Sequence, residues 1–230
     1  MQIYLQKNLP VNIFSMILIN TDFMSKDYTI YNGRLIGVNH NIYLRSSGTQ
    51  YIDSGIYATG NTTFEIKYDA TSESGTIFGS RTSSSSSDRF MLFKSDNNRF
   101  DYNNAYGMIN SFSKAIMKTE ILNDSYSATA TNFASGTTRN ASTSLSVFTT
   151  PKTLKIYAGD TNGTISSYVS AKIYYFKIYE EGVLIRHFVP VPENLVIGNF
   201  TCPSNGMFDI VNQQFYANLG TGDFIYGKDE

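Results

Sequence analysis

Apolar and polar residues alternate with a period of two along most of this chain. The alternation is clearest in KIYYFKIYEEGVLIRHFVP (172–190), where Tyr174, Phe176 and Ile178 fall on one face of an extended segment. Side chains that alternate in this way are typical of a strand with one face in a core. EEG interrupts the pattern with residues that tolerate a tight turn. We therefore predict a hairpin here, with central strands of a sandwich on both sides of the turn.

The same period, broken by turn residues such as SDNNR and NDS, predicts a series of short strands along the rest of the chain. They are expected near Gln50–Gly55, Thr63–Asp69, Gly75–Ser80, Arg89–Lys94, Arg99–Asn103, Ala115–Leu122, Ser127–Ala130, Ser144–Phe148, Thr153–Ala158, Lys172–Glu180, Leu184–Pro190, Gly206–Ile210 and Gln214–Asn218. The segment 51–69 is expected to form a hairpin of its own. No long helical period occurs, and one short helical turn is expected within Ser166–Lys172. The pattern thus predicts an all-β sandwich.

The first part of the chain has a different pattern, richer in Ile, Met and Leu and interrupted by Pro10. Short β segments are expected at Gln2–Leu5, Phe14–Ile19 and Tyr28–Tyr31. The apolar run 11–19 is too short to span a bilayer, so no membrane insertion is expected. We interpret residues 1–41 as an anchoring and oligomerisation segment and residues 42–230 as the sandwich domain. Exposed apolar side chains often mark an interface, and the expected interface residues are Ile13, Phe14, Met16, Ile17 and Leu18.

The composition supports strands and argues against a nucleic-acid partner. The chain of 230 residues has 17 Tyr and 16 Phe, and aromatic residues fit a pleated, half-buried surface. Only 16% of its residues are charged, compared with about 25% in an average protein, so its polar surface is mostly neutral. The formal net charge is −1 and no basic run occurs, so no nucleic-acid partner is expected.

Residues that would support catalysis are sparse. The chain has one cysteine, Cys202, and two histidines, His40 and His187, which are far apart in sequence. A catalytic thiolate needs a basic partner, and we interpret Cys202 as a partly buried structural residue. Glu65 and Asp69 share a strand face, but a lysine lies between them.

Two carboxylates about 5–10 Å apart would be needed for glycoside hydrolysis. The adjacent acids Glu180 and Glu181 lie in a turn and do not form such a pair. We therefore predict that the protein is not an enzyme, with an unusual glycosidase as a remaining alternative.

Oxygen-bearing side chains could hold calcium at the rim of a sandwich. The candidates are Asp96, Asn97, Asn98, Asp101, Asp160 and Asn162. Asx residues are also common turn formers, and this interpretation is favoured, so no cofactor is predicted. By the same reasoning Asp53 and Asp209, near strand ends, are expected to accept hydrogen bonds in turns, and Arg186 is expected to be paired or to lie along the sheet.

Sugar binding is the most specific chemistry that the polar residues suggest. Amides and hydroxyls suit hydroxyl recognition, and a Tyr ring can stack on a sugar face. The same residues could instead form an uncharged surface coat. The candidates for a glycan site are Arg81, Asp88, Arg89, Asp96, Asn97, Arg99, Tyr102, Asn103 and Tyr106.

Four phrases of this sequence together resemble one family. They are YLRSSGTQYIDSGIYATGNTTFEIKY (43–68), GTIFGSRTSSSSSDRFMLF (75–93), AKIYYFKIYEEGVLIRHFVPV (171–191) and GMFDIVNQQFYANLGTGDF (206–224). In this order they are similar to the concanavalin A-like, laminin-G-like jelly-roll domains of bacteriophage and prophage structural proteins. The resemblance covers about residues 42–228. The segment VPENLVIGNFTCPSNGMFD departs from the family pattern, and the first 40 residues have no counterpart in it.

The resemblance implies a concanavalin A-like jelly-roll β-sandwich of two antiparallel sheets and a place in the virion. The implied role is a head or tail fibre, an appendage or a capsid decoration, without enzymatic activity. The expected partners are other virion proteins, further copies of this chain in a homo-oligomer, and host-surface glycans. The alternative is a bacterial carbohydrate-binding lectin domain.

Overall fold

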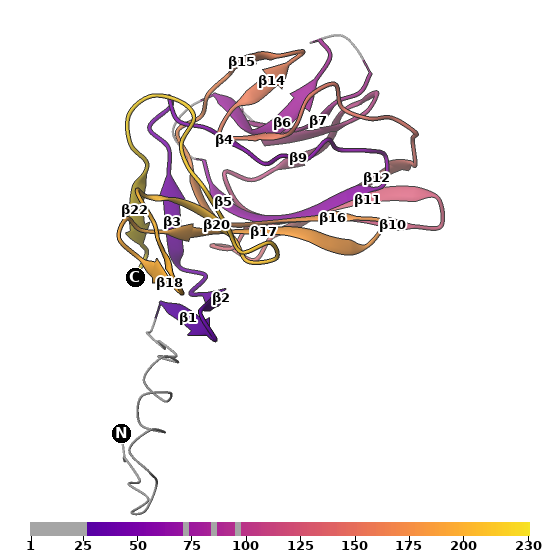
Figure 1. The fold of residues 1–230 in the computed structure, drawn as a ribbon. Coiled ribbons are helices and arrows are strands. Elements are labelled where there is room, and N and C mark those ends of the chain that lie inside the picture. Colours follow the sequence, from indigo (N-terminus) through magenta and orange to yellow (C-terminus); the bar gives the residue numbers. More distant parts are fainter. Residues whose placement is uncertain (1–26, 71–73, 84–86, 95–97) are drawn as a thin grey trace, which may run out of the picture.

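The computed structural model describes residues 27–70, 74–83, 87–94 and 98–230, and these form two stacked layers of strands (Figure 1). The described residues contain no helix, so none that could cross a membrane. The expected interface residues Ile13, Phe14, Met16, Ile17 and Leu18 lie outside this part, as do Asp96 and Asn97. The prediction of an all-β sandwich is confirmed.

Within the described residues, ten strands form the larger sheet, and its neighbouring strands pair antiparallel. Their order is β12 (Thr138–Ser144), β11 (Ser125–Thr131), β10 (Lys114–Leu122), β5 (Thr62–Asp69), β16 (Lys172–Glu180), β17 (Val183–Val191), β20 (Gly206–Asp209) and β21 (Gln214–Tyr216). β3 (Ile42–Arg45) pairs with one end of β16 and with β22 (Ile225–Lys228).

Eight described strands form the smaller sheet, which lies above the larger one in Figure 1. Its order is β15 (Thr164–Ser166), β14 (Gly159–Thr161), β6 (Gly75–Arg81), β7 (Phe90–Lys94), β8 (Asn98–Tyr102) and β9 (Ala105–Ser111). β13 (Lys155–Ile156) pairs with β6 and with β4 (Ile52–Asp53). Pairing is antiparallel except between β14 and β6, which run parallel.

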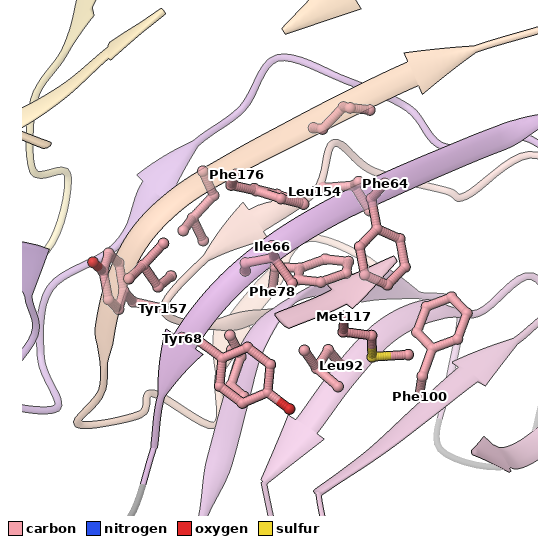
Figure 2. Close-up of a cluster of buried hydrophobic side chains, with 14 of the residues drawn as sticks. Phe64, Ile66, Tyr68, Phe78, Leu92, Phe100, Met117, Leu154, Tyr157 and Phe176 are labelled. Carbon is pink, nitrogen blue, oxygen red and sulfur yellow. The ribbon is translucent and has the colours of Figure 1, made fainter. Parts of the chain in front are cut away.

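The main core fills the space between the two sheets and is rich in aromatic rings (Figure 2). The ring of Phe78 on the smaller sheet lies 4.6 Å from Phe176 and 4.9 Å from Phe64, both on the larger sheet. Phe64 also lies 5.0 Å from Phe100. Truncating a buried Phe to Ala costs about 3–5 kcal/mol, so these contacts hold the two layers together.

A second apolar cluster covers the other face of the larger sheet. Two small hairpins lie there: β1 (Tyr28–Tyr31) with β2 (Arg34–Val38), and β18 (Val196–Ile197) with β19 (Phe200–Thr201). Their turns touch closely, because a Cβ at Gly198 would lie 2.7 Å from the carbonyl oxygen of Gly33. The hairpin β1–β2 thus packs on strands of the sandwich, and the predicted domain boundary at residue 41 stays a prediction.

A β-bulge in β16 changes the predicted faces of that strand. Its register shifts between Ile173 and Tyr175, so Ile173 joins Phe176 and Ile178 in the main core. Tyr174 and Tyr175 both lie in the second cluster. The predicted grouping of Tyr174 with Phe176 is therefore wrong, whereas the predicted hairpin of β16 with β17 is confirmed.

Other local predictions also fail. The segment 51–69 is no hairpin, because β4 pairs in the smaller sheet and β5 in the larger one. Residues 167–171 form no helical turn. The predicted strand at Ser144–Phe148 lies mostly outside any strand, and its Val147 is fully exposed.

Candidate functional site

Three arginines converge on the outer face of the smaller sheet. Arg81 ends β6, Arg89 precedes β7, and Arg99 lies in β8. Because side chains alternate along β8 and Phe100 is in the core, Arg99 and Asp101 point to the outer face. These four residues and Tyr106 of β9 are called the arginine cluster below.

Asp101 lies at the centre of the arginine cluster and is fully buried. Its Oδ1 accepts a hydrogen bond from the backbone N–H of Gly107 at 2.7 Å. The arginine contacts are longer: Oδ1 lies 3.5 Å from Nε of Arg99, and Oδ2 lies 3.9 Å from Nη1 of Arg89. Burial raises the pKa of Asp101, and the Gly107 N–H and the arginines oppose that rise. Charge-assisted hydrogen bonds are about 2.7–2.9 Å long, so Asp101 attracts both guanidinium groups without bonding closely to either.

Tyr106 forms the exposed wall of the arginine cluster. Its ring centroid lies 4.0 Å from Cζ of Arg99 and 5.3 Å from Cζ of Arg89. These cation–π contacts fix the ring, yet 59% of the residue remains exposed. The ring therefore offers apolar surface for stacking next to charged groups.

Like charges lie close together in the arginine cluster. Three guanidinium groups surround one carboxylate, and the pKa of Arg81 is lowered by burial and then by Arg89, with Arg99 contributing less. Arg81 donates from Nε to Oγ1 of Thr161 at 3.1 Å. The three arginines are therefore close enough to influence one another electrostatically.

A cleft of about 630 Å³ continues from Gly107 along the edge of the sandwich. It lies between the edge strands β9 and β12 and is lined by polar groups that include Asn110, Arg139 and Asn140. Nη1 of Arg139 donates to the carbonyl oxygen of Asn110 at 3.3 Å, and its guanidinium lies over the ring of Phe112 at 4.5 Å. The cleft thus begins one residue beyond Tyr106 and includes Arg139.

The structure brings together four of the residues that the sequence predicts for a glycan site: Arg81, Arg89, Arg99 and Tyr106. The prediction for Tyr102 is wrong, because it is fully buried and its ring stacks on Tyr126 at 3.8 Å.

Asp88 and Asn103 serve a local turn next to the arginine cluster. Both have positive φ angles, of 65° and 48°, and the N–H of Asp88 donates to Oδ1 of Asn103 at 3.0 Å. Asp101 and Arg139 were not expected in this site from the sequence. The RFDY pattern could have shown that Arg99 and Asp101 share a face.

Two of the calcium candidates, Asn98 and Asp160, make contacts within the fold. Asn98 is buried and donates from Nδ2 to the carbonyl oxygen of Phe112 at 2.9 Å. Oδ1 of Asp160 accepts the N–H of Gly163 at 2.6 Å, and Oδ2 lies 3.7 Å from Nζ of Lys155. In the part of the chain that the structure describes, no three His, Cys, Asp or Glu side chains gather so that they could hold a metal ion.

A second groove, of about 680 Å³, lies on the outer face of the larger sheet. Glu65, Lys118, Glu120 and Tyr179 are among its lining residues, and Glu65 is paired with Lys177 at 3.2 Å. Apolar groups such as Ile121 also line this groove.

Near the second groove, the two histidines flank one tyrosine. The ring of Tyr175 lies 5.0 Å from His40 and 6.5 Å from His187. The pKa of His187 is lowered to about 4, mainly by burial and then by Lys177. His187 is therefore neutral at physiological pH.

Three sequence interpretations about structural residues are confirmed. Oδ1 of Asp53 accepts the N–H of Gly55 at 2.9 Å, and Oδ1 of Asp209 accepts the N–H of Val211 at 3.0 Å. Arg186 is paired with Asp209, with Nε 3.6 Å from Oδ2. Cys202 is buried, and burial raises the pKa of its thiol to about 11.

These contacts make the arginine cluster the strongest candidate for a binding site, on geometry alone. It combines three arginines, a buried carboxylate and an exposed aromatic ring on one face of the smaller sheet. Comparisons of the chain with protein-family models, with curated proteins and with solved structures found no match.

Proposed function

We propose that this chain is a non-enzymatic structural protein of a bacteriophage virion, in a head or tail fibre, an appendage or a capsid decoration. In this proposal its sandwich is a concanavalin A-like jelly roll that binds host-surface glycans or neighbouring subunits. Two features support the proposal: the four family-like phrases in their order, and the two-layered antiparallel sandwich that such a domain requires.

One observation carries the glycan part of the proposal. Tyr106 is held by Arg89 and Arg99 with more than half of its surface exposed, and a polar cleft begins at the next residue. Sugar sites combine an aromatic platform with fixed polar groups. The arginine cluster supplies both on a rigid sheet.

The test of glycan binding uses the full chain and its Tyr106→Ala variant. Both are incubated with immobilised bacterial surface polysaccharides, and retention is measured. We expect retention of the native chain and a loss of about tenfold or more in affinity for the variant, because a stacked ring contributes on the order of 1–3 kcal/mol. Equal retention of both proteins contradicts a glycan site at Tyr106.

The virion part has a separate test. Bacteriophage particles are purified from an infected culture, and the chain is sought in them by mass spectrometry. Its presence at a stoichiometric level supports the proposal. Its occurrence only in the cell extract, and never in particles, contradicts it.

A bacterial carbohydrate-binding lectin domain is the second candidate, because the exposed ring of Tyr106 would serve it equally well. The two candidates differ in where the chain is found. A lectin binds glycan with the same dependence on Tyr106 but is produced by uninfected cells and is absent from particles.

A further inference from the structure

We propose that a pocket beside β15, at the opposite edge of the smaller sheet from Tyr106, is a second sugar site that takes a neutral 6-deoxyhexose or N-acetylhexosamine unit. The choice of a sugar rests on the proposed function, whereas the place and the chemistry come from the pocket itself. Its volume is about 420 Å³, which lies in the range of small-molecule sites. It is called the tyrosine pocket below, and its lining residues are Thr49, Tyr51, Ile165, Tyr168, Leu219, Gly220 and Thr221.

One wall of the tyrosine pocket joins two segments that lie far apart in the sequence. The N–H of Thr221 donates to the carbonyl oxygen of Thr49 at 3.1 Å, and the N–H of Leu219 donates to that of Tyr51 at 2.9 Å. Oγ1 of Thr49 donates in return to the carbonyl oxygen of Thr221 at 2.8 Å. A Cβ at Gly220 would lie 2.1 Å from the carbonyl oxygen of Thr49, so the close approach of the segments requires glycine there. The wall is therefore held by its own hydrogen bonds, which lowers the entropy cost of binding a ligand.

The opposite wall comes from the edge strand β15 and the residues after it. Ile165 lies in β15, and Tyr168 follows the end of that strand. The N–H of Val169 donates to the carbonyl oxygen of Tyr157 at 3.1 Å. A Cβ at Gly75 of β6 would lie 2.3 Å from the carbonyl oxygen of Tyr168. The backbone that carries Tyr168 is thus packed closely against the smaller sheet.

The rings of Tyr51 and Tyr168 meet as a corner of the tyrosine pocket. Their centroids lie 6.1 Å apart, and their planes are inclined at 59°. Non-bonded carbon atoms pack about 3.5–4.0 Å apart, so a sugar ring does not fit between two rings at this separation. A sugar would instead stack on the face of one tyrosine while the other tyrosine closes its side.

The lining residues select a neutral ligand with an apolar substituent. Two tyrosines and two threonines bring hydroxyl groups, which can donate and accept hydrogen bonds, and none of the seven lining residues carries a charge. A charged sugar would lose water there without gaining an opposite charge from these residues, which costs free energy. Ile165 and Leu219 add aliphatic surface, which favours contact with a methyl group. A 6-deoxyhexose carries such a methyl group at C6, and an N-acetylhexosamine carries one in its acetamido group.

The test measures the binding of methyl glycosides to the full chain by ligand-observed NMR and calorimetry. The probes are the glycosides of fucose, rhamnose and N-acetylglucosamine, those of glucose, galactose and glucuronate, and an oligoproline peptide, because proline-rich segments also dock on aromatic grooves. We expect at least one of the first three to bind about fourfold or more tightly than every other probe, a factor that one buried methyl group contributes. Its affinity should stay constant between about 20 mM and about 300 mM NaCl, because no charge takes part.

Two substitutions assign the binding to the tyrosine pocket. Tyr168→Ala removes one ring and should weaken the preferred glycoside about tenfold or more. Leu219→Ser removes aliphatic surface from a residue that is 57% exposed, so it should leave the fold intact and abolish the preference over glucose. Tyr57→Ala is the matched control, because this tyrosine is 54% exposed and lies outside the lining of the tyrosine pocket, and it should change nothing.

The outcomes separate this inference from the proposed function. Loss of binding in Tyr168→Ala, with binding kept in Tyr106→Ala, supports the tyrosine pocket. The reverse result overturns the tyrosine pocket and keeps glycan binding at Tyr106. Equal affinity for glucose and the preferred glycoside, tighter binding of glucuronate, or binding of oligoproline alone overturns the class of ligand. Absence of binding to every glycoside overturns this inference, and absence of retention on the immobilised polysaccharides contradicts the glycan part of the proposed function as well.

Discussion

Two buried aspartates of this protein have different surroundings. Asp101 in the smaller sheet and Asp209 in the larger sheet are both fully buried, and both lie next to arginine. From the described residues, Asp209 accepts three hydrogen bonds shorter than or equal to 3.0 Å, whereas Asp101 accepts one. The two sites therefore satisfy a buried charge in different ways.

The surroundings of Asp209 satisfy its carboxylate with local donors. Oδ1 accepts the backbone N–H groups of His187 and Val211 at 2.8 and 3.0 Å, and Oδ2 accepts Nδ2 of Asn212 at 2.7 Å. Arg186 adds one cation at 3.6 Å. These contacts tie β17 to the turn after β20, so the charge stabilises the fold.

Asp101 accepts one short hydrogen bond, and its other contacts are arginine side chains at longer distances. Arg89 and Arg99 approach to 3.9 and 3.5 Å, and Arg81 is close enough for the other two to lower its pKa. A buried charge that only holds the fold needs one partner with good geometry. Asp101 therefore lies among several arginines at longer range, whereas Asp209 is held by short local hydrogen bonds.

Asp209→Ala has the largest expected effect. Its loss leaves two backbone N–H groups, Asn212 and Arg186 without their acceptor, and breaking a buried pair costs about 3–5 kcal/mol. The measurement is the free energy of unfolding from urea titration. Asp209→Asn keeps an acceptor for the backbone N–H groups and should cost less. A loss for Asp209→Ala below about 1 kcal/mol would contradict a fold-holding role.

The next largest expected effect is a pH dependence of stability caused by His187, whose backbone N–H donates to Asp209. The pKa of His187 is lowered to about 4 in the folded state, against about 6.5 in an unfolded chain. Between these values the unfolded state binds more protons, so stability is full above about pH 6.5 and is lost as pH falls toward about 4. The expected loss is about 3 kcal/mol, at 1.36 kcal/mol for each unit of pKa difference.

The measurement for His187 is the thermal midpoint of unfolding at several pH values. His187→Gln should flatten the change between about pH 6.5 and 4.5, because the group that gains a proton on unfolding is gone. His40→Gln is the control and should flatten it less, since His40 is exposed. Parallel pH curves for the native chain and His187→Gln would refute the assignment.

The sequence predicts strands well where apolar side chains alternate without interruption. β5, β10, β16 and β17 were all expected, because each has apolar residues at every second position. β12 was missed, since TRNASTS contains almost no apolar residue and its strand pairs only with β11 among the described strands. An edge strand of this kind is specified by its partner rather than by its own pattern.

Sheet membership could not be predicted from local pattern. β4 and β5 are neighbours in sequence but pair in different sheets, and β4 pairs with β13, about a hundred residues away. The bulge at β16 is likewise invisible in the sequence, because Tyr174 fits either face of a strand. Long-range pairing decided both features.

The candidate site was predicted in part because its residues lie on successive antiparallel strands. Arg81, Arg89, Arg99 and Tyr106 come from β6 to β9, which are adjacent in the smaller sheet. Tyr102 was included wrongly because proximity in sequence does not reveal the face. The role of Asp101 depends on contacts across three strands, which no local spacing shows.

Asp101→Asn tests the difference between the two aspartates directly. The amide keeps an acceptor for the Gly107 N–H but removes the negative charge among three arginines, so we expect a loss of about 1–2 kcal/mol in unfolding free energy. Adding the glycoside that the native chain binds most tightly should recover part of the loss, because binding to the folded state stabilises it. The measurement is urea unfolding with and without that glycoside.

The matched variant for Asp101→Asn is Asp209→Asn, which should show no recovery with the glycoside. Arg186 is the single arginine paired with Asp209 within the described residues, so Asp209 lies outside the arginine cluster. Equal recovery in both variants would show a general effect of the added glycoside. The proposed difference between the two sites would then be wrong.

The smallest expected effect comes from removing one hydroxyl from either of two tyrosines. Tyr102 donates to the carbonyl oxygen of Gly60 at 2.8 Å and is fully buried, so Tyr102→Phe should cost about 1 kcal/mol of stability. Tyr106→Phe keeps the exposed ring over Arg99 and should change neither stability nor glycan affinity. Urea unfolding and glycoside titration measure the two effects. A loss of affinity in Tyr106→Phe as large as in Tyr106→Ala would mean that the hydroxyl, rather than the stacked ring, contacts the sugar.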